Sequence, residues 1–332
     1  MKVLMLTRLF YPHVGGVEKH VLRITQELIK KGFNITIITE RYKQELKQNE
    51  KVSKAKVIRI DYPKIKLIGL LVIWIELIKK YKLIKEADIV HINDVFIWYL
   101  PLRFFFPRKK VYMTFHGWEG EYPISTISII QKKIANILTN GSICIGAYIE
   151  KYFGIKCNQI SYGACDKTVV SNENKTGLVF IGRLENDTGL SIFLEAVRDL
   201  NLKKVIFIGD GELRNKCAKY GEVKGFVKNA IKYVSKTKIV YASGYLTILE
   251  ALSEGCMVIA AYDNPLKENY LKDAPFSKSI FITDKSDKLA SYISKILKSK
   301  EKKQYKDSKV QDWLKKQTWD KLANDYIKLW NV

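Results

Sequence analysis

The stretch VLMLTRLFYPHVGGVEKHVLRITQELIKKGFNITIIT, residues 3–39, decides the fold class of this chain. It begins with an apolar run typical of a buried strand, and Gly15-Gly16 marks a turn. Apolar residues then recur at intervals of four, three and four along one face of a helix that stops at Gly32: Val17, Val21, Ile24 and Leu28. Asn34–Thr39 follows as the next strand. This order of strand, helix and strand predicts a parallel sheet covered by helices.

The same alternation runs through two successive halves of the chain. Four further strands are expected in the first half: Val57–Ile60, Asp88–Ile92, Lys110–Phe115 and Ser142–Ile145. Five are expected in the second half: Leu178–Ile181, Val205–Ile208, Ile239–Ala242, Val258–Ala261 and Ile280–Thr283. We therefore predict an α/β protein with two Rossmann-like, doubly wound parallel-sheet domains, 1–165 and 166–317, separated at the polar stretch Asp166–Thr176. A last helix, within 318–332, would pack back on the first domain. Ligands of open parallel sheets bind at the carboxyl ends of strands, so two facing domains predict a cleft between them.

The composition supports two globular cores and a basic surface. The 332 residues are 47% hydrophobic and 27% charged, in the range of folded domains. The 57 Lys and Arg exceed the 34 Asp and Glu by 23, which predicts attraction to nucleotide diphosphates, lipid phosphates, anionic membranes or nucleic acid. Nucleic acid ranks lowest, because the sequence has no zinc finger, RRM-type aromatic motif or concentrated arginine tract.

The cysteines and the N-terminus indicate a cytoplasmic protein. The five cysteines are odd in number and widely spaced, without a C-x-x-C pair: Cys144, Cys157, Cys165, Cys217 and Cys256. We expect neither a disulfide framework nor a zinc site. Met1 leads directly into an apolar strand, and no run of 18 apolar residues occurs, so we expect neither a signal peptide nor a membrane span.

One segment, residues 64–82, combines an apolar body with lysines at both ends. Such a helix usually belongs to the core, with its lysines in solvent. It could also rest on an anionic membrane surface. Together with the net charge, it suggests peripheral membrane association and a lipid-linked acceptor.

Glycines follow several of the expected strands. Gly15-Gly16 either form a tight turn or let a ligand approach the backbone N–H groups at the start of a helix. Gly182-Arg183 follows a strand, where an arginine could bind a diphosphate. Gly209-Asp210-Gly211 is a weaker signal, since Asp-Gly pairs mostly serve as turns.

Three further residues could contact a ligand. Glu250 lies early in a predicted helix, either facing solvent or accepting the hydroxyls of a ribose, with the helix N-terminus near Thr247 facing phosphate. His91 and His116 end parallel strands in the first domain. There a histidine could bind a sugar hydroxyl or a phosphate, or serve as a structural hydrogen-bonding group.

Taken in order, these segments resemble family 4 of the glycosyltransferases, which are retaining enzymes with the GT-B fold. The resemblance rests on five motifs: Gly-Gly-Val-Glu (15–18), Thr-Phe-His-Gly (114–117), Gly-Arg-Leu (182–184), Gly-Asp-Gly-Glu (209–212) and Leu-Thr-Ile-Leu-Glu-Ala (246–251). It spans nearly the whole chain. The closing Thr318-Trp319-Asp320 is similar to the point where the family's C-terminal helix crosses to the first domain.

The resemblance implies a role for each motif. Gly15 and Gly16 would lie near the donor phosphate and the acceptor, with Glu18 and His91 on the acceptor side. The implied catalytic residues are His116 beside the transferred sugar, Arg183 on the diphosphate and Glu250 on the ribose. The rest of the donor site would be Gly182, Thr188, Gly209, Asp210, Gly211, Glu212, Phe226, Val227, Leu246 and Thr247.

Two departures from the family pattern stand out. The lysine that usually partners the phosphate arginine is replaced by Thr188, and the usual first carboxylate by Ala242-Ser243. Lys175, Lys203 or Lys204 could supply the missing positive charge. The departures leave open a catalytically weakened nucleotide-sugar-binding protein, and the fold also hosts nucleotide-sugar epimerases.

The implied reaction is front-face transfer of a hexose with retention of anomeric configuration. The leaving diphosphate would be stabilised by Arg183, backbone N–H groups and helix dipoles. The sequence has no Asp-x-Asp pair of the kind that holds Mg²⁺ in other glycosyltransferases. We therefore expect neither a metal nor a cofactor, and a nucleotide sugar as the donor substrate.

Overall fold

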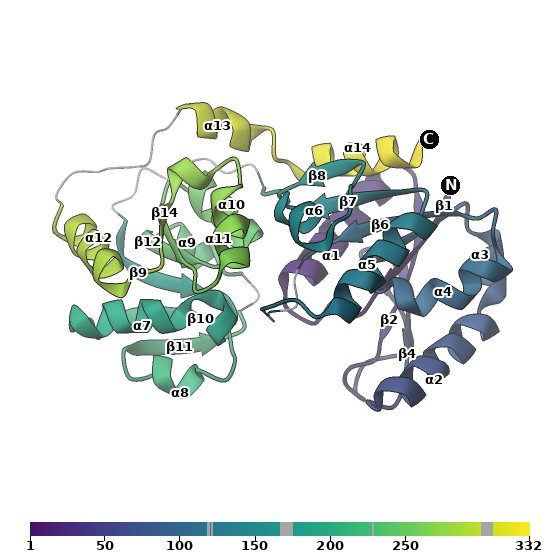
Figure 1. The fold of residues 1–332 in the computed structure, drawn as a ribbon, viewed down its shortest axis with the longest axis horizontal. Coiled ribbons are helices and arrows are strands. Elements are labelled where there is room, and N and C mark those ends of the chain that lie inside the picture. Colours follow the sequence, from purple (N-terminus) through teal and green to yellow (C-terminus); the bar gives the residue numbers. More distant parts are fainter. Residues whose placement is uncertain (118–119, 121, 167–174, 228, 300–307) are drawn as a thin grey trace. The chain divides into compact units, whose positions relative to one another are not determined.

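The computed structural model describes residues 1–117, 120, 122–166, 175–227, 229–299 and 308–332 (Figure 1). Its internal contacts divide the chain into two compact units. Unit 1 comprises Met1–Glu119, Pro123–Ser161 and Trp319–Val332, and unit 2 comprises Gly120–Tyr122 and Tyr162–Thr318. Most of the predicted boundary stretch, namely 167–174, lies outside the described residues.

Unit 1 is built on an eight-stranded sheet in the order β3-β4-β2-β1-β5-β6-β7-β8, parallel except for the β3–β4 pair. Its strands are β1 (Lys2–Thr7), β2 (Asn34–Glu40), β3 (Asn49–Val52), β4 (Ala55–Ile60), β5 (Ile89–Asn93), β6 (Lys110–Phe115), β7 (Gly141–Ile145) and β8 (Gln159–Ser161). Its helices are α1 (Gly16–Lys30), α2 (Lys66–Lys79), α3 (Tyr81–Glu86), α4 (Phe96–Phe105), α5 (Thr126–Leu138), α6 (Tyr148–Phe153) and α14 (Trp319–Trp330). Strand β1 is central, with Leu6 opposite Ile38 of β2 and Ile92 of β5.

Unit 2 is built on a six-stranded, fully parallel sheet in the order β11-β10-β9-β12-β13-β14. Its strands are β9 (Thr176–Ile181), β10 (Val205–Ile208), β11 (Gly221–Gly225), β12 (Thr237–Ala242), β13 (Met257–Ala261) and β14 (Phe281–Thr283). Its helices are η1 (Asn186–Thr188), α7 (Leu190–Asp199), α8 (Arg214–Cys217), α9 (Ile231–Val234), α10 (Tyr245–Ser253), α11 (Pro265–Lys272), η2 (Ser277–Ser279), α12 (Ser286–Lys298) and α13 (Ser308–Lys315).

The predicted fold class, two doubly wound parallel-sheet domains, is confirmed. The central strands were recognisable because a strand buried on both faces is a continuous apolar run. Three strands were missed: β3, β8 and β11. All three lie at sheet edges and contain partly exposed polar residues. None of them therefore has a continuous apolar run.

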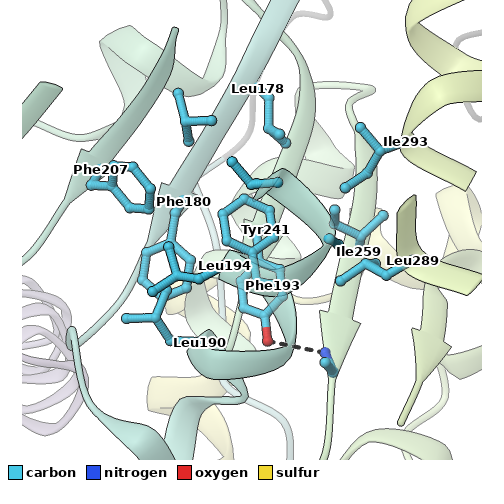
Figure 2. Close-up of a cluster of buried hydrophobic side chains, with 14 of the residues drawn as sticks. Leu178, Phe180, Leu190, Phe193, Leu194, Phe207, Tyr241, Ile259, Leu289 and Ile293 are labelled. Atoms are coloured by element: carbon cyan, nitrogen blue, oxygen red, sulfur yellow. Dashed lines mark hydrogen bonds between the residues drawn. The ribbon is translucent and has the colours of Figure 1, made fainter. Parts of the chain in front are cut away.

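Tyr241 lies at the centre of the core of unit 2 (Figure 2). Its ring packs 4.9 Å from that of Phe180 and 4.7 Å from that of Phe193, measured between centroids. Its hydroxyl donates to the carbonyl oxygen of Thr188 over 2.9 Å and accepts the N–H of Ala261 over 3.1 Å. Burial raises the pKa of the hydroxyl, so it keeps its proton. One phenol thus joins β12 to β13 and to the short helix η1.

The C-terminal helix α14 is joined to the rest of unit 1 by a chain of hydrogen bonds with a fixed direction. The indole of Trp330 can only donate, and it donates to Nδ1 of His91 over 3.0 Å. Nε2 of His91 therefore carries the proton and donates to Oγ1 of Thr114 over 2.8 Å. That hydroxyl donates to the hydroxyl of Tyr326, which donates to Nε2 of His20, each over 2.8 Å. All five side chains are buried.

The two histidines in this hydrogen-bond chain, His20 and His91, are neutral at pH 7. Burial lowers the pKa of His91 to about 3, and the nearby charge of His20 adds to the effect. Burial also lowers the pKa of His20 well below its usual value, with His116 adding to it. Protonating either ring would also disrupt a buried hydrogen bond that needs a neutral nitrogen acceptor.

Cys144 in β7 and Cys157 are joined by a disulfide in unit 1. The expectation that the cysteines form no disulfide is wrong for this pair. Gly154 ends α6 in the left-handed conformation, with φ +59°, and the chain returns to bring the two Cα atoms within 5.9 Å. Spacing alone could not reveal this return. Cys165, Cys217 and Cys256 are free thiols and buried.

Replacing Tyr241 with Phe is expected to lower the free energy of unfolding by about 1–3 kcal/mol, because two buried backbone groups lose their partner while the ring is kept. Urea unfolding followed by circular dichroism measures the loss. Tyr220→Phe is the matched control, since Tyr220 packs at the edge of the same core. Equal stability of the two variants would contradict this role of the Tyr241 hydroxyl.

Stability should fall as the pH is lowered from 7.5 to 5.5. The unfolded chain takes up a proton at each histidine near pH 6.5 while the folded His20 and His91 stay neutral, so each contributes a loss of about 1.4 kcal/mol over this range. Urea unfolding followed by tryptophan fluorescence reads the change. His91→Gln should reduce the loss of stability between pH 7.5 and 5.5 by about 1.4 kcal/mol. A variant as pH-sensitive as the unmodified chain would refute the assignment.

Candidate functional site

Three loops meet at the carboxyl ends of the strands in unit 2. Gly182 follows β9 and Gly209 follows β10, with φ of +158° and +140°. A Cβ on Gly209 would overlap the carbonyl oxygen of Gly182, and a Cβ on Gly182 would lie 2.6 Å from Oγ of Ser243, after β12. Gly209 needs to be glycine because the backbone of Gly182 comes too close for any side chain, and both residues have a positive φ that favours glycine.

The Gly209-Asp210-Gly211-Glu212 loop is anchored on the loop that follows β9. The carbonyl oxygen of Asp210 accepts the N–H of Leu184 over 2.9 Å, and the N–H of Glu212 donates to Oε1 of Glu185 over 3.2 Å. A Cβ on Gly211 would overlap the same carboxylate of Glu185. The loop is therefore held beside Arg183, as the predicted donor site requires.

An exposed aromatic ring borders this loop. The carbonyl oxygen of Gly225, at the end of β11, accepts the N–H of Gly209 over 2.9 Å. Phe226 comes next and is 55% exposed, while Val227 is half-buried. The structure thus brings Phe226 and Val227, two residues of the predicted donor site, next to the 209–212 loop.

Arg183 extends into solvent from the loop after β9, with 59% of its side chain exposed. Its guanidinium pairs with the carboxylate of Asp187. The second oxygen of that carboxylate, Oδ1, is buried and has no hydrogen-bond partner among the described residues. Thr188 is buried, and its hydroxyl donates to the carbonyl oxygen of Glu185 over 2.6 Å. A side chain at position 188 therefore faces the interior here, and Thr188 offers a ligand no positive charge.

Lys267 places a second cation beside Arg183. Its side chain lies 5% exposed in the first turn of α11, and Nζ donates to the carbonyl oxygen of Ser243 over 2.7 Å. Burial lowers its pKa to about 8; Asp187 and Asp263 act to raise that pKa and Arg183 to lower it. A buried ammonium group that interacts with Arg183 and Asp187 lies at the same loop as the predicted phosphate arginine.

Lys267 was not predicted from the sequence, although one signal was present. Asp263-Asn264-Pro265 marks a helix start, and the side chain of Asn264 caps α11 by accepting the N–H of Lys267 over 2.9 Å. A lysine in the first turn of a helix opposes the helix dipole. A residue kept in an unfavourable position of this kind is a candidate for function.

The three lysines suggested for the missing charge lie at the opposite end of the sheet. Lys175 precedes β9, and Lys203 and Lys204 precede β10. The six residues of β9 span about 20 Å, so lysines at the amino ends of the strands lie far from Arg183. Nζ of Lys175 instead donates to the carbonyl oxygen of Ser235, and Nζ of Lys203 lies 5.7 Å from the ring centroid of Tyr220.

The N-terminus of α10 follows Ser243 in the same group of loops. The hydroxyl of Tyr270 accepts the N–H of Tyr245 over 2.8 Å. The N–H groups of Leu246 and Thr247 have no acceptor among the described residues, and they carry the positive end of the helix dipole. Glu250 is half-buried one turn further along the helix. The predicted phosphate-binding and ribose-binding positions therefore lie on one helix.

In unit 1, the glycine loop before α1 is occupied by a carboxylate. Gly15 is extended rather than left-handed, with φ −171°, so it is not needed for a tight turn. A Cβ on Gly15 would overlap the carboxylate of Glu18, whereas Gly16 has open space on its Cα. Oε1 of Glu18 lies 3.0 Å from Nδ1 of His13. Gly15 thus lets the Glu18 carboxylate approach the helix N-terminus, where an anion is favoured.

His116 is held at the carboxyl end of β6. Its Nε2 donates to Oδ1 of Asn93 over 2.9 Å, since the amide oxygen can only accept. Burial lowers the pKa of His116 to about 3, and the charges of His91 and Lys132 add to this. The neutral ring therefore carries its proton on Nε2, and Nδ1 is the nitrogen left to accept a hydrogen bond.

Asp94 positions the backbone of His116 and was not predicted from the sequence. Its carboxylate accepts the N–H of His116 with both oxygens, each over 3.1 Å, and pairs with Nζ of Lys132 at 3.2 Å. Its backbone is left-handed, with φ +58°. Such strain in a residue without a glycine's freedom clusters at functional sites. The sequence signal was an Asn-Asp pair at the end of a buried strand.

His91 does not lie on an acceptor surface, and that prediction is corrected. Its side chain is fully buried, and both ring nitrogens are used by Trp330 and Thr114. The histidine lies two residues before the end of β5, where it still points into the core rather than out of the sheet edge. Of the two strand-end histidines, only His116 keeps a nitrogen for a ligand.

The arrangement in unit 2 suits a doubly charged anion. Arg183 and Lys267 supply two cations, and Leu246 and Thr247 supply two N–H donors at a helix N-terminus. No group of three or more His, Cys, Asp or Glu side chains among the described residues is placed to hold a metal ion.

Two family models match the chain, one in each half. Residues 14–154 match the model described as Glycosyltransferase Family 4, and residues 175–299 match that described as Glycosyl transferases group 1. A short stretch of 60 residues is 35% identical to the phosphatidylinositol N-acetylglucosaminyltransferase GPI3 subunit of Saccharomyces cerevisiae, covering 18% of this chain and 13% of that protein. The chain thus matches only a small part of the length of this relative.

Solved structures with a similar fold extend over the whole chain. A sucrose-phosphate synthase from Thermosynechococcus elongatus superposes with a TM-score of 0.79 at 13% identity, over 99% of this chain and 98% of its own. A structure described as trehalose-6-phosphate from E. coli bound with UDP-2-fluoro glucose has a TM-score of 0.70 at 10% identity, over 100% of this chain and 99% of that chain. These neighbours show that the two parallel-sheet units form the GT-B fold, and the two family matches together show that the chain is a glycosyltransferase of the family 4 type.

Proposed function

We propose that the chain transfers a hexose from a nucleotide-diphosphate sugar to an acceptor, with retention of anomeric configuration, and that unit 2 binds the donor. The observation that carries this proposal is the pair of cations, Arg183 and Lys267, beside the open N–H groups of α10. A neighbour of the same fold is described as bound with UDP-2-fluoro glucose, which supports a nucleotide sugar as the donor class.

In this proposal the leaving diphosphate is stabilised by fixed positive charge. As the bond from the sugar to the phosphate oxygen breaks, negative charge builds on the diphosphate. Arg183 lies on the exposed side of the loop and Lys267 on the buried side, so the two cations contact different oxygens of the diphosphate. Because this charge is supplied by the protein, we propose that transfer needs no metal ion and no cofactor.

The nucleoside end of the donor would extend from these cations along the sheet edge. Glu250 would accept the ribose hydroxyls from its place on α10. The exposed ring of Phe226, with Val227 and the 209–212 loop, would contact the base. Base stacking on an exposed aromatic ring would contribute about 1–3 kcal/mol without selecting one base.

The transferred sugar and the acceptor would contact unit 1. Nδ1 of His116 would accept a hydrogen bond from a sugar hydroxyl. Glu18, Gly15 and Gly16 would lie on the acceptor side. We propose a glycan or a lipid-linked molecule as the acceptor, and we place the protein in the cytoplasm, in contact with a membrane. The relative that matches over 60 residues is named as a phosphatidylinositol N-acetylglucosaminyltransferase subunit.

Lys267→Met is expected to weaken the binding of a nucleoside diphosphate by about 10-fold to 100-fold, because it removes one charge-assisted hydrogen bond worth about 1.5–3 kcal/mol. Arg183→Ala should have an effect of similar size. Isothermal titration measures the affinity, using the nucleoside diphosphate that gives the largest thermal shift. Lys272→Met is the matched control on the same helix, since Lys272 is exposed and paired with Glu268. Equal affinity of Lys267→Met and the control would contradict the proposed role.

The affinity for the diphosphate should also fall as the pH rises from 7 to 9. The pKa of Lys267 is about 8, so the ammonium group loses its proton over this range and the affinity drops about tenfold. The same titration carried out at each pH gives the slope. Lys267→Met should show no such decline. A pH dependence that persists in this variant would assign the titration to another group.

Transfer itself is tested with a panel of nucleotide sugars, by mass analysis of the products with and without a glycan or lipid-linked acceptor. The proposal predicts an acceptor-dependent product that retains the donor's anomeric configuration. Affinity without turnover would instead indicate a nucleotide-sugar-binding protein. Conversion of the donor without an acceptor, to a second nucleotide sugar, would indicate an epimerase.

A further inference from the structure

The outer surface of α2 in unit 1 is apolar. Ile68, Leu71, Ile75 and Ile78 recur at intervals of three, four and three residues, and each is 45–53% exposed. The opposite side of the helix, at Ile73 and Leu77, is buried in the core. This resolves the alternatives for the segment 64–82: one face of the helix is core, and a second apolar face remains in solvent.

Helix α5 repeats the same pattern. Ile127, Ile130, Ile134 and Ile137 follow the same spacing, and are 68%, 50%, 39% and 78% exposed. Of the thirteen residues of this helix only Ala135 is buried. A helix on a sheet normally turns its large apolar side chains inward. In α5 most of them face outward instead.

The two helices belong to one layer. Helix α4 is in contact with both α2 and α5, and Figure 1 shows the three on one side of the sheet of unit 1. At its C-terminal end α4 adds Phe104 and Phe105, each 70% exposed. We call the exposed apolar side chains of α2, α4 and α5 the apolar face. Isolated exposed apolar residues are ordinary, but two stripes in one layer indicate an interaction surface.

Most of the charges around the apolar face are positive. Glu76 is the only carboxylate in the sequence of the three helices, and it is paired with Lys79 at 2.8 Å and Lys80 at 2.7 Å. Lys133 on α5 and Lys82 and Lys85 on α3 are exposed. Lys85, Arg108 and Lys110 also line, with Phe105, a pocket of about 540 Å³ whose two carboxylates, Glu86 and Asp88, are bound by Lys2.

We propose that the apolar face docks on an anionic phospholipid surface, with the lysines and arginines at its border on the headgroups. Apolar side chains flanked by basic ones match the acyl and headgroup layers of a membrane interface. A second copy of the chain would bring two positively charged borders together, which opposes self-association. Among the described residues no helix meets the length and apolarity that a bilayer span requires. In this proposal the apolar face lies in the plane of the interface.

This proposal deepens the proposed function, because it names the surface that would bring the active site to a lipid-linked acceptor. The purpose of the docking rests on the proposed function, but the docking itself does not. Binding to vesicles is measured without a nucleotide sugar, so failure to bind and failure to transfer are separate results.

The test is sedimentation of the full chain with vesicles of phosphatidylcholine, with and without phosphatidylserine, at physiological salt. We expect binding only when phosphatidylserine is present. The double variants Leu71→Gln/Ile75→Gln and Ile130→Gln/Ile134→Gln should each bind at least roughly tenfold more weakly. Ile160→Gln is the matched control, because Ile160 is 43% exposed in unit 1 on the edge strand β8. These positions are exposed, and an unchanged circular dichroism spectrum and unfolding midpoint, measured without nucleotide, show that the variants are folded.

The basic border is tested separately. Lys82→Glu/Lys85→Glu should weaken binding to phosphatidylserine vesicles, whereas Lys203→Glu/Lys204→Glu, the same charge change in unit 2, should have a smaller effect. Light scattering of each variant reports self-association. The proposal is overturned if no vesicle is bound, if the double variants bind as well as the control, or if they only turn a dimer into a monomer.

Discussion

Parallel pairing of strands that are buried on both faces is the constraint on which the rest of this structure depends. A polar side chain along such a strand needs a buried partner, as His91 and Thr114 provide for each other, since a buried polar group without a partner costs about 1–3 kcal/mol. Polar and charged side chains are therefore displaced to the loops at the strand ends. In unit 2 the loops after β9, β10 and β12 come close enough for Gly182, Gly209 and Ser243 to be in contact. The groups that we propose for diphosphate binding lie at these loops for that reason.

The two departures from the family pattern are connected in space. Thr188 is directed into the core, where Tyr241 holds its carbonyl oxygen, so the family's lysine position is used for packing. Lys267 approaches the same loop from α11, and its ammonium group is held by the carbonyl oxygen of Ser243. The segment that lacks the family's first carboxylate thus anchors Lys267, the cation that we propose in place of the family's lysine. In that proposal the charge of the site is preserved although its source in the sequence has moved by many residues.

Unit 1 shows how one type of residue serves two purposes in neighbouring strands. His91 and His116 both lie near the carboxyl ends of parallel strands, and both are neutral because burial lowers their pKa. His91 is fixed from both sides by Trp330 and Thr114, so it fastens the C-terminal helix to the sheet. His116 is fixed from one side by Asn93, which leaves its second nitrogen for a ligand. The difference comes from α14, a helix more than 200 residues away in the sequence. Its Trp330 occupies Nδ1 of His91, whereas it does not reach Nδ1 of His116.

The sequence by itself determined the fold class, the central strands and the glycine loops, because each depends on local patterns: apolar runs, helical periodicity and turn residues. It also pointed to Arg183 and Glu250 through motifs that lie on single loops or helices. The edge strands, the Cys144–Cys157 disulfide, the burial of His91 and the place of Lys267 were decided only by the tertiary structure. Each of these depends on which segments distant in the chain come together. That choice is made by packing and by the satisfaction of buried polar groups, which no short stretch of sequence records.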